Sequence, residues 1–242
     1  MTLELARYSE RPELWEESGE VSAEVWPEYN LHGDVLNPNF GRIFDAFPGF
    51  QFVLHDDGQV VAEGHSAPCP WDGTAEGLRD GIDDMLIAAL DAASPPAALC
   101  ALAAEIRPAH QGRGLANRVL DAMAELGRQA GLAHLIAPVR PSWKERYPLA
   151  PIERYVQWTR DDGQPFDPWI RIHVRRGGRI VKPVPRSMHI TGTVADWEAW
   201  TGMAFPADGD YVFPRGLATV AIDRERDLGD YWEPNVWIVH EL

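Results

Sequence analysis

The chain has 242 residues, of which 22 are Lys or Arg and 37 are Asp or Glu, so its formal net charge is −15. Hydrophobic residues make up 45% and charged residues 24%, ordinary values for a globular protein that exclude a disordered or fibrous chain. The longest uncharged apolar run, residues 97–104, is far shorter than the roughly 20 residues that cross a bilayer. With no membrane span and no apolar signal segment near the N-terminus, the sequence predicts a cytoplasmic protein.

Basic residues gather in one third of the sequence. Residues 107–186 contain 15 of the 22 Lys and Arg against 7 Asp and Glu, a net charge of +8 in that window. The acidic remainder would repel a long phosphate backbone, which argues against nucleic acid as a partner. A small phosphorylated ligand is favoured instead.

The first hundred residues alternate helical and strand patterns. Between residues 12 and 29, Leu14, Ser18, Val21 and Val25 recur every three or four positions, which predicts an amphipathic helix. A loop containing Pro38 follows. The next patterns predict a hairpin with strands at 50–55 and 59–67, and then a helix over 78–92.

Residues 97–139 have the pattern strand, Gly-rich turn, helix, strand. A helix that connects two strands in this way predicts a βαβ unit with parallel strands. Residues 140–158 read as a Pro-broken helix or loop. Further strands are predicted at 169–175, 179–184, 217–222 and 235–240.

The turn of this unit reads Gln111-Gly112-Arg113-Gly114-Leu115-Ala116. Unpaired amides and the positive end of a helix dipole bind phosphate at such a turn, and glycines let the main chain come close to the anion. The P-loop pattern fails because no Gly-Lys-Ser/Thr ending is present. The dinucleotide fingerprint fails because Val139 and Arg140 stand where an acidic residue is needed.

The turn resembles motif A of the GCN5-related N-acetyltransferases, in which Gln or Arg is followed by two residues, Gly, one residue, and Gly or Ala. The resemblance implies a mixed, mostly antiparallel α/β sheet flanked by helices, with acetyl-coenzyme A as co-substrate. It implies that Ile106 and Arg107 meet the pantetheine arm. The residues implied to hold the pyrophosphate are Gly112, Arg113, Gly114, Leu115 and Ala116, and Gln111 starts this cofactor-binding motif.

The same family often places Asn, two residues, Ala, three residues and Tyr after the next strand. Arg140, Trp143 and Tyr147 stand at these places, so only the tyrosine is kept. By resemblance, Tyr147 is the candidate acid that protonates the departing thiolate, and Arg140 is a candidate phosphate contact.

Acyl transfer to an amine also needs a base, and two residues are candidates. Glu105 lies on the strand before the turn, although family members with a glutamate base on this strand place it earlier, near Cys100. His65 would share one face of the hairpin with Glu63, and histidine titrates near neutral pH. The histidines form no HxH or HExxH pattern, and two cysteines are too few for a four-ligand zinc site, so no metal is expected.

These observations predict an acyltransferase, with residues 1–186 as the acyl-coenzyme A-binding core and 187–242 as an extension that completes the sheet and the acceptor pocket. The expected reaction is acetyl transfer to a small amine by direct attack in a ternary complex. Tryptophans beside Pro and Gly suggest an apolar or aromatic acceptor. Two alternatives stay open: a decarboxylase or S-acyltransferase of malonyl-type thioesters, and a non-catalytic acyl-coenzyme A-binding module. Whether the chain forms a homodimer is also open.

Overall fold

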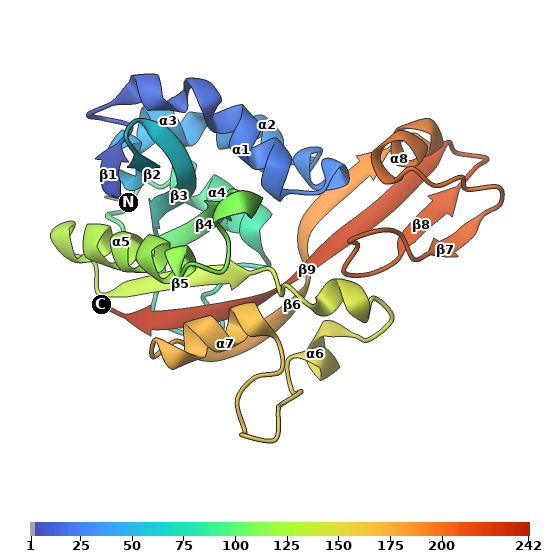
Figure 1. Ribbon diagram of the computed structural model, residues 1–242. Coiled ribbons are helices and arrows are strands. Elements are labelled where there is room, and N and C mark those ends of the chain that lie inside the picture. Colours follow the sequence, from blue (N-terminus) through green and yellow to red (C-terminus); the bar gives the residue numbers. More distant parts are fainter. Residues whose placement is uncertain (1–2) are drawn as a thin grey trace.

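A mixed sheet carries the structure, and helices cover both of its faces (Figure 1). The computed structural model describes residues 3–242, with the side chains of all of these except residues 16–18. The strands are β1 (Glu4–Arg7), β2 (Gln51–Asp56), β3 (Gln59–Cys69), β4 (Ala98–Ile106), β5 (His134–Val139), β6 (Arg179–Gly192), β7 (Gly209–Tyr211), β8 (Val220–Asp223) and β9 (Leu228–Glu241). Their order is β1-β2-β3-β4-β5-β9-β8-β7, with β6 also paired to β9.

Eight α-helices and five short 3-10 segments connect the strands in the described part of the chain. The α-helices are α1 (Ser18–Val25), α2 (Leu36–Phe40), α3 (Arg42–Ala46), α4 (Ile82–Leu90), α5 (Leu115–Gln129), α6 (Ile152–Tyr155), α7 (Pro168–Arg175) and α8 (Val194–Thr201). The 3-10 segments are η1 (Pro12–Glu17), η2 (Glu28–Leu31), η3 (Pro48–Phe50), η4 (Pro108–His110) and η5 (Lys144–Arg146). Within residues 3–242, no helix has the length and apolar character needed to cross a membrane.

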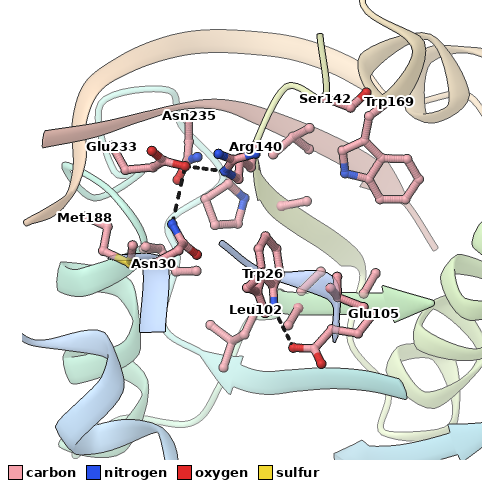
Figure 2. Close-up of a pocket in the computed structure, with 18 of the residues that line it drawn as sticks. Trp26, Asn30, Leu102, Glu105, Arg140, Ser142, Trp169, Met188, Glu233 and Asn235 are labelled. Carbon is pink, nitrogen blue, oxygen red and sulfur yellow. Dashed lines mark hydrogen bonds and ion pairs between the residues drawn. The ribbon is translucent and has the colours of Figure 1, made fainter. Parts of the chain in front are cut away.

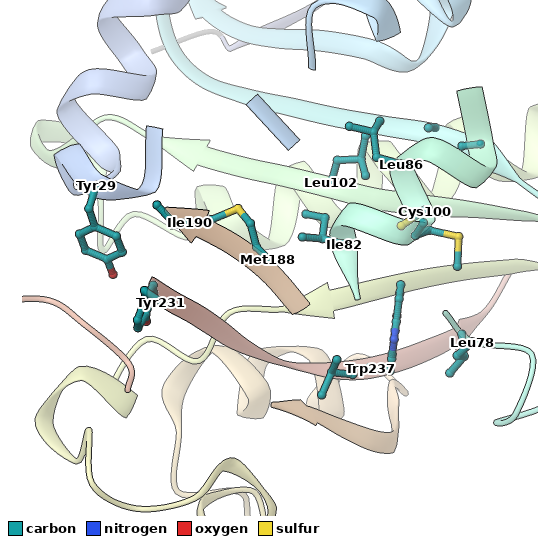
Figure 3. Packing of buried hydrophobic residues seen from close by; sticks show 14 of the residues in the cluster. Tyr29, Leu78, Ile82, Leu86, Cys100, Leu102, Met188, Ile190, Tyr231 and Trp237 are labelled. Atoms are coloured by element: carbon teal, nitrogen blue, oxygen red, sulfur yellow. The ribbon is translucent and has the colours of Figure 1, made fainter. Parts of the chain in front are cut away.

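Alternation along the central strands divides the core between two layers. Leu99 packs with α5 on one face, whereas Cys100 packs with α4 on the other. Figure 3 shows the second layer, in which Leu86 of α4, Cys100 and Trp237 of β9 belong to one buried cluster. Since successive strand residues point to opposite faces, both faces of these strands are apolar and both are covered.

The βαβ prediction is confirmed. Every paired neighbour in the sheet is antiparallel except β4 and β5, which are parallel and joined through α5. The hairpin prediction is also confirmed by β2 and β3. The amphipathic helix predicted over residues 12–29 is divided into η1, α1 and η2, and the predicted loop around Pro38 contains the short helices α2 and α3.

The predicted strand at residues 169–175 is wrong, because this segment is helix α7. The Asp167 side chain accepts hydrogen bonds from the main-chain N–H groups of Trp169 and Ile170, and Pro168 occupies the first turn. An N-cap aspartate followed by proline favours a helix start. The alternation of Ile and Val with polar residues imitates a strand, but the cap decides the structure. The strand predicted at residues 217–222 lies slightly later, as β8.

The C-terminal part of the chain completes the sheet. β9 pairs with β5 along the whole length of β5, and β6 crosses the boundary between residues 186 and 187. Gly81, which precedes α4, also lies directly against the main chain of Ser187, whose hydroxyl accepts a hydrogen bond from the Ile82 N–H at 3.0 Å. We therefore expect residues 1–186 and 187–242 to fold as one unit.

Replacing Gly81 by Ala should destabilise the protein, because a Cβ atom there would lie 2.2 Å from the Ser187 Cα. Since main chain cannot move aside cheaply, we expect a loss of about 2–4 kcal/mol. Gly19→Ala is the control, because nothing lies within 4 Å of a Cβ at that position in α1. The midpoint of urea unfolding should be lower for Gly81→Ala and unchanged for Gly19→Ala. Equal midpoints in the two variants would mean that the main chain near Ser187 moves aside at little cost.

Candidate functional site

A cavity opens where β4 and β5 part. The two strands pair only at Leu99 with Leu135 and at Cys100 with Ile136. Immediately afterwards the β3–β4 register shifts, so that Ala101 pairs with Ser66 and Ala103 with His65, and Leu102 becomes an extra residue in β4. Such a bulge bends a strand and increases its twist. The facing edges of β4 and β5 are therefore open beyond the bulge.

The cavity between these strands has a volume of about 420 Å³. Its walls include β4 from Ala101 to Ile106, β5 from Ala137 to Val139, and residues of α1, α5, α7 and β9. Figure 2 shows Trp26, Leu102 and Glu105 on one side, and Arg140, Glu233 and Asn235 on another. Segments that are far apart in the sequence thus meet at one cavity.

The Gly-rich turn lies at one end of this cavity, through Gln111 and Ala116, which line it. Gly112 and Gly114 have φ angles of 74° and 78°, in the left-handed region that favours glycine. Within the described residues, the amides of Gly112, Arg113 and Gly114 donate no hydrogen bond to the protein. Leu115, the first residue of α5, is buried. The turn therefore presents unpaired donors at a helix N-terminus, an arrangement that binds anions.

The two residues predicted to meet pantetheine differ in their surroundings. Ile106 lines the cavity. The Arg107 side chain instead forms ion pairs with Glu24 and Glu20 of α1 and donates a hydrogen bond to the Val60 carbonyl. Its guanidinium therefore ties α1 to the sheet, and only its main chain continues the line of β4.

Glu105 is the acidic residue of β4 that reaches the cavity. Its side chain is 2% exposed, and its two carboxylate oxygens accept hydrogen bonds from Trp26 Nε1 at 2.7 Å and from Ser22 Oγ at 2.9 Å. Burial raises the pKa of Glu105 above its ordinary value, while nearby His65 and the Trp26 hydrogen bond act in the opposite direction. A carboxyl group with a raised pKa inside a cavity is suited to proton transfer.

Glu63 and His65 lie beside Glu105, beneath α1. Glu63 is directly opposite Glu105 in the β3–β4 register, and such like-charged pairs destabilise a sheet unless they are neutralised. His65 Nε2 lies 3.1 Å from Glu63 Oε2, and His65 Nδ1 lies 3.3 Å from Gln51 Oε1. The Gln51 amide donates to two main-chain carbonyls, which turns its oxygen toward the imidazole. Nδ1 therefore donates to the Gln51 oxygen, and Nε2 faces the Glu63 carboxyl group.

Among the described residues, these three groups are also candidate metal ligands. One ligand atom each from Glu63, His65 and Glu105 lies within 4.8 Å of the others, and all three residues are buried. Sequence spacing did not indicate this group, because the bulged pairing of β3 with β4 brings it together. Both nitrogens of His65 and both oxygens of Glu105 already have protein partners.

Arg140 lines the cavity but is occupied by protein groups. Its guanidinium forms an ion pair with Glu233 and donates hydrogen bonds to the Tyr29 hydroxyl and the Arg215 carbonyl, both at 2.9 Å. Burial by itself would lower the pKa of Arg140, but Glu233, through its charge and its hydrogen bond, acts together with Tyr29 and Tyr231 to raise the pKa above its ordinary value. A phosphate would have to compete with Glu233 for this guanidinium.

Tyr147 lies on the outer side of this region. Its ring packs against Tyr155, Trp158 and Phe166, its side chain is 38% exposed, and it is not among the residues that line the cavity. A role in protonating a thiolate inside the cavity therefore stays a prediction from the resemblance.

His173 of α7 is a cavity residue that sequence reasoning missed. Its Nδ1 lies 2.9 Å from His240 Nε2, and His240 makes a further hydrogen bond with the main chain of Arg176. Within the described residues, His173 Nε2 has no hydrogen-bond partner. Burial, followed by the effects of His240 and Arg176, lowers the pKa of His173 to about 3, so the imidazole is neutral at physiological pH.

A signal for His173 was present in the sequence. Trp169 and His173 have the spacing of the small residue and tyrosine in the family pattern described above, and Gly177 follows them. Predicting α7 as a strand concealed this pattern, because the spacing has meaning only on a helix.

Comparison with known proteins gives one close sequence relative. The arginine N-acetyltransferase avaD of Aspergillus versicolor is 30% identical, and the match covers 96% of this chain and 91% of that protein. The search against family models found no match.

Solved structures show the same fold. The loading GNATL domain of CurA from Lyngbya majuscula has a TM-score of 0.68 at 18% identity, covering 100% of this chain and 98% of that chain. The GphF GNAT-like decarboxylase in complex with isobutyryl-CoA has a TM-score of 0.62 at 18% identity, covering 100% of this chain and 99% of that chain. From its sequence relative, its fold and its Gly-rich turn, this chain belongs to the GCN5-related N-acetyltransferase superfamily of acyl-coenzyme A-dependent transferases.

Proposed function

We propose that this protein transfers an acetyl group from acetyl-coenzyme A to a nitrogen of a small amino acid such as arginine. The observation that carries the proposal is a single cavity that runs from the Gly-rich turn to the buried carboxylate of Glu105. The relative named an arginine N-acetyltransferase, which matches nearly the whole chain, supports the acceptor class.

The open edge of β4 and the turn together suit coenzyme A. Residues 101–106 of β4 pair with β3 on one side and have no strand partner on the other within the described chain. An extended pantetheine arm can add to such an edge through main-chain hydrogen bonds. The unpaired amides of Gly112, Arg113 and Gly114 would then receive the pyrophosphate.

In the proposed reaction, Glu105 is the base. The acceptor nitrogen gives its proton to Glu105 and attacks the thioester carbonyl carbon, forming a C–N bond. Main-chain N–H groups on the open edge of β4 would stabilise the oxyanion. When the intermediate collapses, the C–S bond breaks and the thiolate takes up a proton, for which Tyr147 is the donor that the resemblance implies. His173 Nε2 would accept a hydrogen bond from a bound substrate.

Glu105→Gln should lower kcat by about 10²- to 10⁴-fold, the usual contribution of general base catalysis. The assay is release of coenzyme A from acetyl-coenzyme A in the presence of arginine, with product mass measured in parallel. Glu125→Gln is the control, since Glu125 is exposed on α5. Tyr147→Phe in the same assay tests the proton donor separately. Carbon dioxide release from malonyl-coenzyme A, without acetylation of any amine, would overturn the proposal in favour of a decarboxylase.

Trp26→Phe should shift the acid limb of the pH–rate profile to higher pH. The hydrogen bond from Trp26 Nε1 stabilises the carboxylate form and lowers the pKa of Glu105, so its removal raises that pKa further. As pH falls through this pKa the base becomes protonated, and activity is lost at a higher pH in the variant. An unchanged acid limb, measured as kcat/KM between pH 5 and 9, would show that another group limits the rate.

Changing both Gly112 and Gly114 to Ala should abolish micromolar binding of acetyl-coenzyme A in isothermal titration. Both residues have positive φ, which costs about 1–2 kcal/mol for Ala, so the turn would rearrange and its amides would no longer converge. Gly163→Ala is the matched control, with φ of 75° and nothing within 4 Å of a Cβ. If the double variant and Gly163→Ala bind acetyl-coenzyme A with equal affinity, the turn does not bind coenzyme A.

A further inference from the structure

Arg215 combines an unusual backbone with a charged side chain at the cavity. Its φ angle is 62°, in the left-handed region that ordinary residues rarely adopt. Its carbonyl oxygen accepts hydrogen bonds from the Tyr29 hydroxyl and from Arg140 Nη2, both at 2.9 Å. Tyr29 is 1% exposed, and Arg140 is held by Glu233. Hydrogen bonds from Tyr29 and Arg140 thus hold the Arg215 backbone in this conformation, and they fix the position of its Cα and Cβ atoms.

The Arg215 guanidinium uses only part of its hydrogen-bonding capacity within the described chain. Its Nη2 donates to the Val25 carbonyl at 2.8 Å, the residue is exposed, and it lines the cavity. Of the two arginines that line the cavity, Arg140 is paired with Glu233, whereas no described carboxylate pairs with Arg215. A guanidinium carries five N–H donors in a fork that matches a carboxylate in two parallel hydrogen bonds. Arg215 can therefore bind a ligand anion without losing its contact to Val25.

Arg215 and Glu105 meet the same short segment of chain. Arg215 holds the Val25 carbonyl, and the adjacent residue, Trp26, donates to Glu105. Apart from the Arg140–Glu233 ion pair, the charged residues that line the cavity are the carboxylate of Glu105 and the guanidinium of Arg215, which lacks a carboxylate partner in the described chain. A zwitterion has the complementary pair of charges.

We propose that Arg215 binds the carboxylate of the acceptor, and that the enzyme selects amino acids over the corresponding decarboxylated amines. This assignment rests on the proposed function, because it takes the acceptor nitrogen to be near Glu105. Coenzyme A phosphates are the other anions in the reaction, but the Gly-rich turn that suits them reaches the cavity through other residues, Gln111 and Ala116.

Arginine and agmatine test the proposal, because they differ only in the carboxylate. We expect Arg215→Ala to raise KM for arginine by about 10- to 100-fold, the range for losing a charge-assisted pair, and to change KM for agmatine less than about threefold. Arg215→Asn is the second variant, because Asn tolerates the left-handed backbone. It should change the two KM values in the same way as Arg215→Ala. If Arg215 only holds α1 through Val25, both acceptors will weaken by the same factor, which overturns the proposal. A rise in KM for acetyl-coenzyme A alone also overturns it.

Calorimetric titration of arginine and agmatine into the protein with coenzyme A present separates this proposal from the reaction itself. If the unaltered protein acetylates neither compound but binds arginine, and loses that binding in Arg215→Ala, the carboxylate site stands while the proposed function fails. If it acetylates amines yet binds both compounds equally, before and after the change, the function stands and the site assignment fails. If it binds neither compound, the site assignment is overturned.

Discussion

The bulge at Leu102 is the constraint on which the rest of the structure depends. Before it, β4 and β5 form a parallel pair; after it, they separate and leave a cavity bounded by open main chain. A continuous pairing would have satisfied every main-chain group of these strands and left no room for a ligand. The unpaired edge is tolerable because both strands keep a partner on their other side, β3 for β4 and β9 for β5.

Pairing of buried charges decides which charged groups of the cavity lack a partner of opposite charge. Arg140 forms an ion pair with Glu233, and His65 contacts Glu63, which lies opposite Glu105. Pairing of this kind removes the high cost of isolated charges in a low-dielectric interior. What remains at the cavity is Glu105, held by two hydrogen-bond donors, and Arg215, held through its carbonyl. The charges to which we assign a role are thus few, and each is positioned by hydrogen bonds to neutral groups.

The C-terminal extension contributes to the site as well as to the sheet. Met188, Arg215, Glu233 and Asn235 all line the cavity, together with Val25, Trp26 and Asn30 from the N-terminal part of the chain. The turn suited to coenzyme A, in contrast, comes from the βαβ unit alone. Segments that are distant in sequence therefore form the part of the cavity in which we propose that the acceptor binds, whereas the turn belongs to the βαβ unit.

Local patterns determined the βαβ unit, the β2–β3 hairpin and the phosphate-type turn, because strand alternation, helical spacing and positive-φ glycines act within a few residues of one another. Tertiary structure decided the rest. Glu63 lies opposite Glu105 because of the register in which β3 pairs with β4. Arg140 forms an ion pair with Glu233 because β9 lies beside β5. Helix α7, and with it His173, was hidden because an aspartate cap outweighed a strand-like alternation. Sequence patterns report propensity and period, whereas the partner of a buried charge depends on which distant strand folds against it.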